Sequence, residues 1–170
     1  MIPMLFSEVR VTGVADTPVL LLREAQGVRH LAVWITAAGG NAILSALEDA
    51  DDEHPGTHDL MIEALSVLEA VVDSVHITDV VEGVYSAHIV VGGSNVTARV
   101  SDAVALALRC GATILADEDL LDEAGVGGSD TEVPPAGTLG EGGGDEQLEE
   151  FRAFLDMINP EDFGPSPQQP

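Results

Sequence analysis

The sequence contains no lysine, and its six basic residues are all arginine. Because there are 30 acidic residues, the formal net charge at pH 7 is −24. A charge of this size favours solubility, and it repels the nucleic-acid backbone and anionic membrane surfaces at long range. Composition alone therefore counts against a role in nucleic-acid or membrane binding.

Cysteine and aromatic residues are also scarce: aromatics make up 4% of the chain, and Cys110 is the single cysteine. The 45% of hydrophobic residues is too high for a wholly disordered chain, so we expect a core of aliphatic side chains. One cysteine cannot form an internal disulfide, and its position in the apolar run VALALRCGA predicts a buried thiol. The sequence has no zinc-binding spacing, no nucleophile elbow and no phosphate-binding glycine loop before a helix.

Long apolar segments are missing as well. The chain does not begin with a basic region followed by an apolar core, and no apolar run reaches the roughly 20 residues of a membrane span. Asp102 and Arg109 interrupt the best candidate. We therefore predict a cytoplasmic protein without a membrane partner.

The composition divides the chain into four parts. Residues 1–125 alternate strand and helix patterns, whereas residues 126–147 are rich in glycine, proline and acidic residues and predict a flexible linker. Residues 148–159 have apolar residues at helical spacing and predict a short amphipathic helix, and residues 160–170 predict a disordered, proline-rich end. Such a short helix could dock on its own domain, on a neighbouring subunit or on a protein partner.

The first part has an element order that predicts an α+β fold, with helices packed on a mixed, largely antiparallel sheet. Alternating patterns predict strands, and apolar residues at helical spacing predict helices. The expected elements are strands at 7–15, 17–25 and 29–35, helices at 41–50 and 57–71, a hairpin at 74–91 that turns at Glu82-Gly83, a strand at 94–100, a helix at 102–110, a strand at 112–116 and a helix at 117–124 closed by Gly125.

Two of these helices open on similar polar residues, in THDLMIEAL and RVSDAVALAL. A Thr57 or Ser101 hydroxyl is a typical N-cap, worth about 1 kcal/mol, and an aspartate in the first turn suits the helix dipole. Capping explains neither His58 nor Arg99, and a helix start is also a place where anions bind. Two caps and one chemical site therefore both stay open as interpretations.

Four separated motifs then occur in a fixed order: AVWI before a helix, THDL, ITDVVEGVYSA and RVSDAVALAL. In this order they resemble the bifunctional nuclease family, over roughly residues 5–125. The resemblance implies a compact α+β domain that self-associates and that hydrolyses phosphodiester bonds of DNA and RNA. The polar positions that match the family pattern are Thr57, His58, Asp59, Arg99, Ser101 and Asp102. The chain departs from that pattern at WITAAGG, where Thr36 replaces a glycine and Gly39 replaces an acidic residue.

We therefore take His58, Asp59, Arg99, Ser101 and Asp102 as candidate catalytic residues. In this hypothesis Asp59 and Asp102 hold Mg²⁺ or Mn²⁺, His58 acts as general base or acid, and Arg99 binds the phosphate. No organic cofactor is expected.

Other functions stay open. The chain could be a non-catalytic oligomeric scaffold or partner-binding module, in which Arg99, Asp59 and Asp102 form a buried ion-pair network. It could also hold a small anionic metabolite at the helix starts. Catalysis requires that the two helix starts meet in space.

Overall fold

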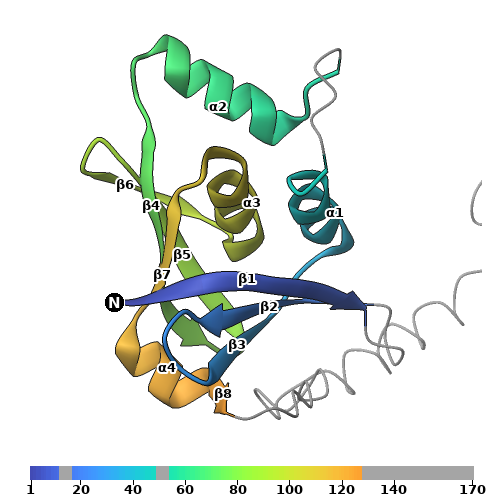
Figure 1. The fold of residues 1–170 in the computed structure, drawn as a ribbon, viewed down its shortest axis with the longest axis vertical. Coiled ribbons are helices and arrows are strands. Elements are labelled where there is room, and N and C mark those ends of the chain that lie inside the picture. Colours follow the sequence, from blue (N-terminus) through green and yellow to red (C-terminus); the bar gives the residue numbers. More distant parts are fainter. Residues whose placement is uncertain (12–16, 49–53, 128–170) are drawn as a thin grey trace, which may run out of the picture. The chain divides into compact units, whose positions relative to one another are not determined.

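The structure, a computed structural model, describes residues 1–11, 17–48 and 54–127. These residues form strands that bend around one central helix (Figure 1). In chain order the elements are β1 (Ile2–Val11), β2 (Pro18–Glu24), β3 (Arg29–Trp34), α1 (Ala37–Ser45), α2 (Thr57–Val67), β4 (Val72–Val81), β5 (Val84–Val91), β6 (Ser94–Ala98), α3 (Val100–Cys110), β7 (Thr113–Ala116), α4 (Glu118–Ala124) and β8 (Gly125–Gly127).

The strands form one sheet in the order β6-β5-β4-β7-β1-β2-β3-β8. The β4–β7 pair is parallel, and the other neighbouring pairs are antiparallel. The predicted α+β fold with a mixed, largely antiparallel sheet is therefore confirmed. The predicted turn between β4 and β5 is confirmed too, because Glu82 and Gly83 both have positive φ angles, of 51° and 77°, as a two-residue hairpin turn requires.

Helix α3 lies at the centre of the described part of the chain (Figure 1). It contacts β4, β5 and β7, and α1 and α2 pack beside it. Seven of its residues are buried, which agrees with its uniformly apolar sequence: Val100, Ser101, Ala103, Val104, Ala105, Leu106 and Ala107. The helix ends at Cys110 and is capped by Gly111, whose left-handed φ of 71° is typical of a glycine C-cap.

The prediction of a buried Cys110 thiol is wrong, whereas the predicted end of α4 at Gly125 is confirmed, although not with the usual conformation of a glycine cap. Cys110 is exposed, because it occupies the last turn of α3 beyond the buried stretch, and its Sγ lies 3.1 Å from the Leu106 carbonyl oxygen. Gly125 does not close α4 in a left-handed conformation. It is extended, with φ −74° and ψ 134°, and begins β8, which pairs with β3 and reaches two residues into the predicted linker. The sequence Gly-Val-Gly is too short to show a strand pattern.

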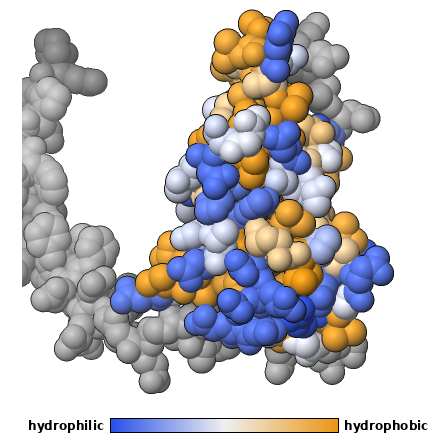
Figure 2. Space-filling view, turned by 90° about the vertical axis from the view of Figure 1, so that its left-hand side faces the viewer, coloured by the Kyte–Doolittle hydropathy of each residue, from blue (hydrophilic) through white to orange (hydrophobic). Residues whose placement is uncertain are grey.

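Helix α2 differs most from expectation. It ends at Val67 rather than residue 71, and none of its residues is buried. Leu60 and Leu68, two apolar residues of the predicted helix, are 59% and 75% exposed. Figure 2 shows apolar side chains gathered at the top of the molecule, the end where α2 lies in Figure 1. The apolar spacing correctly indicated a helix, but it did not identify a covering surface.

Some predictions fall outside the described residues: the linker beyond Gly127, the amphipathic helix at 148–159 and the proline-rich end at 160–170. Within the described ranges, no helix is long and apolar enough to cross a membrane.

Candidate functional site

The starts of α2 and α3 meet. His58 in the first turn of α2 places its Nε2 atom 3.2 Å from Oδ1 of Asp102, in the first turn of α3. The N-caps are not the predicted hydroxyl residues, however. Gly56 and Arg99 occupy the cap positions in extended conformations, and neither helix has a side-chain N-cap of its own. Thr57 and Ser101 already lie inside their helices, because the extended backbone ends one or two residues earlier.

Asp102 is the centre of a three-residue cluster. Arg99 donates from Nε to Oδ2 at 2.6 Å and from one terminal nitrogen to Oδ1 at 3.2 Å, and His58 makes the third contact. Burial raises the pKa of Asp102, but the hydrogen bonds and charges of Arg99 and His58 outweigh burial, so that its pKa lies below the usual value. Asp102 is therefore a carboxylate at neutral pH.

The charge of Asp102 fixes the protonation of its neighbour. A carboxylate offers only acceptor oxygens, so the His58 Nε2 that faces it carries the hydrogen. The lone pair then lies on Nδ1, which has no partner among the described residues and is not sealed from solvent. A histidine held in this way by a carboxylate is suited to accept a proton at its free nitrogen.

Asp59 faces the other end of α3. Its Oδ1 accepts from Arg109 Nε at 2.6 Å, and its Oδ2 accepts from the Gly56 backbone N–H at 2.9 Å. The hydrogen bond from Arg109 is the main reason that the pKa of Asp59 is lowered. Arg109 also donates to the carbonyls of Ala42 and Ala105, at 2.9 and 3.1 Å, and to the Ser45 hydroxyl at 3.4 Å. Asp59 thus belongs to a clamp that joins three helices.

This arrangement does not suit one metal ion shared by Asp59 and Asp102. Each carboxylate already faces its own arginine, at opposite ends of α3. No cluster of three or more His, Cys, Asp or Glu side chains suited to a metal occurs among the residues that the structure describes. The side chains of the described residues therefore provide no site for a metal-dependent step.

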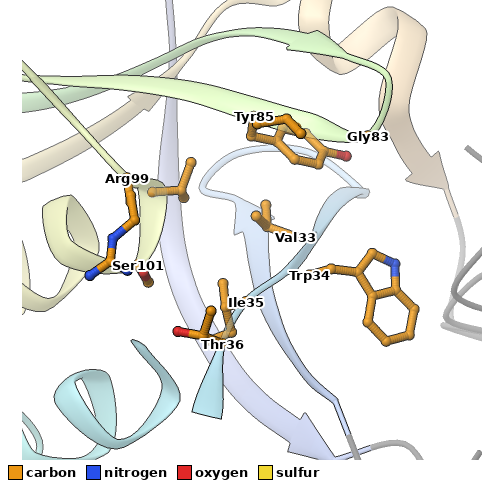
Figure 3. Close-up of a pocket in the computed structure, with 10 residues that line it drawn as sticks. Val33, Trp34, Ile35, Thr36, Gly83, Tyr85, Arg99 and Ser101 are labelled. Atoms are coloured by element: carbon orange, nitrogen blue, oxygen red, sulfur yellow. The ribbon is translucent and has the colours of Figure 1, made fainter. Parts of the chain in front are cut away.

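A cavity of about 210 Å³ lies beside Arg99. Its polar wall contains Thr36, Arg99 and Ser101, and its remaining wall is apolar apart from the Tyr85 hydroxyl (Figure 3). Sequence reasoning missed Arg109, Thr36 and Tyr85. The resemblance held one signal, since Tyr85 belongs to the ITDVVEGVYSA motif, whereas Arg109 entered the sequence analysis only as a charge that interrupts an apolar run.

Comparisons with known proteins identify the family of the chain. A sequence model of the bifunctional nuclease domain matches residues 20–128. Two uncharacterized proteins of Mycobacterium tuberculosis, from the CDC 1551 and H37Rv strains, are each 36% identical to this chain over 162 residues, which cover 92% of this chain and 97% of theirs. With a match over most of its length and two relatives that align almost end to end, the chain belongs to the bifunctional nuclease domain family.

Proposed function

We propose that this protein hydrolyses phosphodiester bonds of single-stranded nucleic acid, with the reaction centred on His58, Asp102 and Arg99. The observation that carries the proposal is the contact of His58 with Asp102, which joins the starts of two separate helices beside an exposed arginine. Membership of the bifunctional nuclease domain family supports it.

Each member of the cluster has a part in the proposed step. Asp102 holds the His58 ring through Nε2, and His58 Nδ1 takes a proton from a water molecule. The oxygen of that water forms a bond to phosphorus, and the bond from phosphorus to the leaving sugar oxygen breaks. That oxygen takes a proton from solvent, and His58 releases its extra proton to solvent. Arg99, whose side chain is 67% exposed, binds the phosphate oxygens and stabilises the charge that builds on them.

The net charge of −24 opposes binding of a long strand. Arg99 attracts a phosphate only at short range, because salt screens charges separated by more than about 8 Å at physiological ionic strength. We therefore expect a high KM for long substrates and an activity that short oligonucleotides reveal best.

The test is cleavage of single-stranded DNA and RNA oligonucleotides by the purified full-length chain, with Mg²⁺, Mn²⁺ or a chelator. His58→Ala and Asp102→Asn are expected to slow cleavage by at least about 100-fold. His88→Ala is the matched control, since His88 lies on β5 and its side chain makes no hydrogen bond within the described residues. Cleavage that survives both site substitutions overturns the proposal. Loss of cleavage in chelator restores the hypothesis of a Mg²⁺ or Mn²⁺ cofactor.

A second candidate function is that of an oligomeric scaffold, in which the ion pairs of Asp59 and Asp102 only support the fold. An exposed groove of about 240 Å³ favours it, because its lining carries no charged side chain. The groove is lined by Met61, Ala64, Leu65, Leu68, Val72, Ile89, Val91, Val96 and Leu106. We propose a second copy of this chain as its occupant, because two such uncharged faces can meet without bringing acidic residues together.

Oligomer mass, measured by light scattering, tests the scaffold function. Leu68→Glu should give monomers if the groove is the interface, whereas Glu82→Gln, in the β4–β5 turn, serves as a surface control. A chain that is monomeric without substitution contradicts self-association. If deletion of residues 141–170 exposes the groove to a hydrophobic dye while the mass per particle stays monomeric, the occupant is the C-terminal segment instead.

A further inference from the structure

We propose that the cavity beside Arg99 binds one nucleotide of the substrate, with its phosphate at the start of α3 and its base against Tyr85. This inference rests on the proposed function for the identity of the ligand. The cavity, however, is separate from the His58 nitrogen that accepts the proton, and binding can be measured without hydrolysis.

The phosphate would bind at the N-terminus of α3, which has no side-chain cap. Helix α3 is 11 residues long, and its N-cap residue, Arg99, provides no side-chain hydrogen bond to the first turn. The first backbone N–H to reach a carbonyl of the helix is that of Ala103, which donates to the Arg99 oxygen at 3.0 Å. The preceding N–H groups are therefore available to an anion, at the positive end of the helix dipole.

Ser101 gives the independent sign of a ligand. The residue is 5% exposed, lines the cavity, and its hydroxyl makes no hydrogen bond to any residue that the structure describes. The Ser101 oxygen is not among the buried side-chain atoms that lack a partner, so it is accessible from the cavity that the residue lines. Figure 3 shows Ser101 beside Arg99 on one side of the cavity, with Thr36 next to them. A phosphate between Ser101 and Arg99 would supply the missing acceptor.

Helix α1 adds to this end of the cavity. Its N-cap, Thr36, lines the same space, and the first turn of α1 contains no acidic residue that would repel an anion. The two helices approach closely here, because a Cβ atom at Gly39 would lie 2.7 Å from both Cβ and Oγ of Ser101. Glycine at this position thus lets the starts of two helices face one phosphate group.

The rest of the cavity suits a base. Val33, Ile35 and Val84 supply an apolar wall, and the Tyr85 ring lies across it from Ser101 (Figure 3). Burial raises the pKa of Tyr85, so its hydroxyl stays protonated and can donate to a base edge. Trp34 also borders the cavity, but Figure 3 shows its indole pointing away. Tyr85 is therefore the aromatic residue placed to stack on a base.

The volume limits the ligand to one nucleotide. About 210 Å³ is several times the roughly 30 Å³ that one water molecule occupies, so a lone phosphate leaves most of the space empty. It is also below the roughly 300 Å³ at which pockets that enclose a whole drug-sized ligand begin, so the cavity takes no more than one nucleotide and does not enclose all of it. A phosphate joined to one base uses both the polar and the apolar wall.

The experiment is calorimetric titration of the full-length chain with AMP, adenosine and inorganic phosphate as separate probes. AMP should bind at least about tenfold more tightly than either fragment. Ser101→Ala should weaken AMP binding about tenfold through loss of a hydrogen bond to a charged group. Tyr85→Leu should weaken AMP and adenosine but leave phosphate unchanged. Ser86→Ala is the matched control, since Ser86 is an exposed neighbour of Tyr85 on β5.

A measurement on the unsubstituted protein tests the proposal even if a variant does not fold. AMP should shift the backbone amide resonances of Val100, Ser101 and Asp102 in an NMR titration. Unchanged resonances, or equal affinity for AMP and phosphate, overturn the nucleotide pocket. If oligonucleotides are cleaved while AMP does not bind there, this proposal fails and the proposed function stands. If AMP binds but no oligonucleotide is cleaved, the proposed function fails and the pocket stands.

Discussion

The two ends of α3 carry the same kind of ion pair in opposite settings. At its C-terminal end, Arg109 is 9% exposed and donates to four acceptors on three helices. At its N-terminal end, Arg99 is 67% exposed and borders a cavity. An arginine that uses four of its five N–H donors inside the fold stabilises that fold, whereas an exposed arginine at a helix start remains able to bind an anion.

The comparison separates two aspartates that look equivalent in the sequence. Asp59 and Asp102 both occupy the first turn of a helix, and both accept from an arginine. Only Asp102 also contacts a histidine. We therefore assign Asp59 to the structural clamp and Asp102 to the proposed reaction, and substitutions at the two ends should have opposite consequences.

The largest expected effect is on catalysis at the N-terminal end. His58→Ala removes the proposed proton acceptor and should lower kcat for oligonucleotide cleavage by about 10²–10⁴-fold. The urea concentration at the midpoint of unfolding should change little, because the His58 side chain makes a single hydrogen bond in the described structure. Equal cleavage rates for the variant and the unsubstituted protein, measured by gel electrophoresis of labelled RNA, would remove His58 from the reaction.

The next effect is on stability at the C-terminal end. Arg109→Met removes a hydrogen-bond donor from Asp59 Oδ1 and from the carbonyls of Ala42 and Ala105, and it should lower the free energy of unfolding by about 3 kcal/mol. Urea denaturation measures this loss, and Arg23→Met, at an exposed position of β2, is the control. The cleavage rate per folded molecule should stay constant. A variant that unfolds normally but cleaves slowly would reverse the assignment of the two ends.

The sequence could predict one end of α3 better than the other. The uniformly apolar run from Ala103 to Leu108 indicated a buried helix, and Arg99 with Asp102 marked its start as polar. The role of Arg109 could not be predicted, since its acceptors Ala42 and Asp59 are 67 and 50 residues away along the chain. Such contacts arise from tertiary packing, which leaves no local pattern.

The same limit explains the errors elsewhere in the fold. Alternation and helical spacing report local periodicity, so they predicted the hairpin turn at Glu82-Gly83 and the existence of α2. They do not report which surface covers an apolar face, and α2 leaves Leu68 largely exposed. The cavity beside Arg99 likewise joins β3, β5 and α3, and could not be seen in any one segment.

A smaller effect is expected where α1 meets the start of α3. In Gly39→Ala the new Cβ would lie 2.7 Å from Ser101, and such overpacking costs about 1–3 kcal/mol. The better helix propensity of alanine offsets about 1 kcal/mol of this cost. Gly40→Ala is the matched control, because its Cβ would meet Pro18 at an ordinary 3.5 Å and should stabilise the protein. If both variants gain stability in urea denaturation, α1 does not pack tightly on Ser101.

The smallest expected effect is the pH dependence of the stability that Asp59 contributes at the C-terminal end of α3. Arg109 lowers the pKa of Asp59, so this carboxyl binds protons less readily in the folded chain than in the unfolded chain. Its contribution to stability is therefore complete above the unfolded pKa of about 3.9 and is lost as the pH falls through the folded value. Asp59→Asn should lower the free energy of unfolding by about 1 kcal/mol at pH 7.

That difference should shrink below about pH 4, where Asp59 of the unfolded chain takes up a proton while Asp59 of the folded chain does so only at lower pH. Asp119→Asn, at an exposed position of α4, is the control for the change in net charge. Urea denaturation at pH 7, 5 and 3 measures the difference, and one that stays constant with pH would mean that Arg109 stabilises the three helices through its carbonyl contacts rather than through Asp59. Asp59→Asn should still cleave RNA, because Asp102 holds His58 without it. A loss of cleavage without a loss of stability would return Asp59 to the reaction.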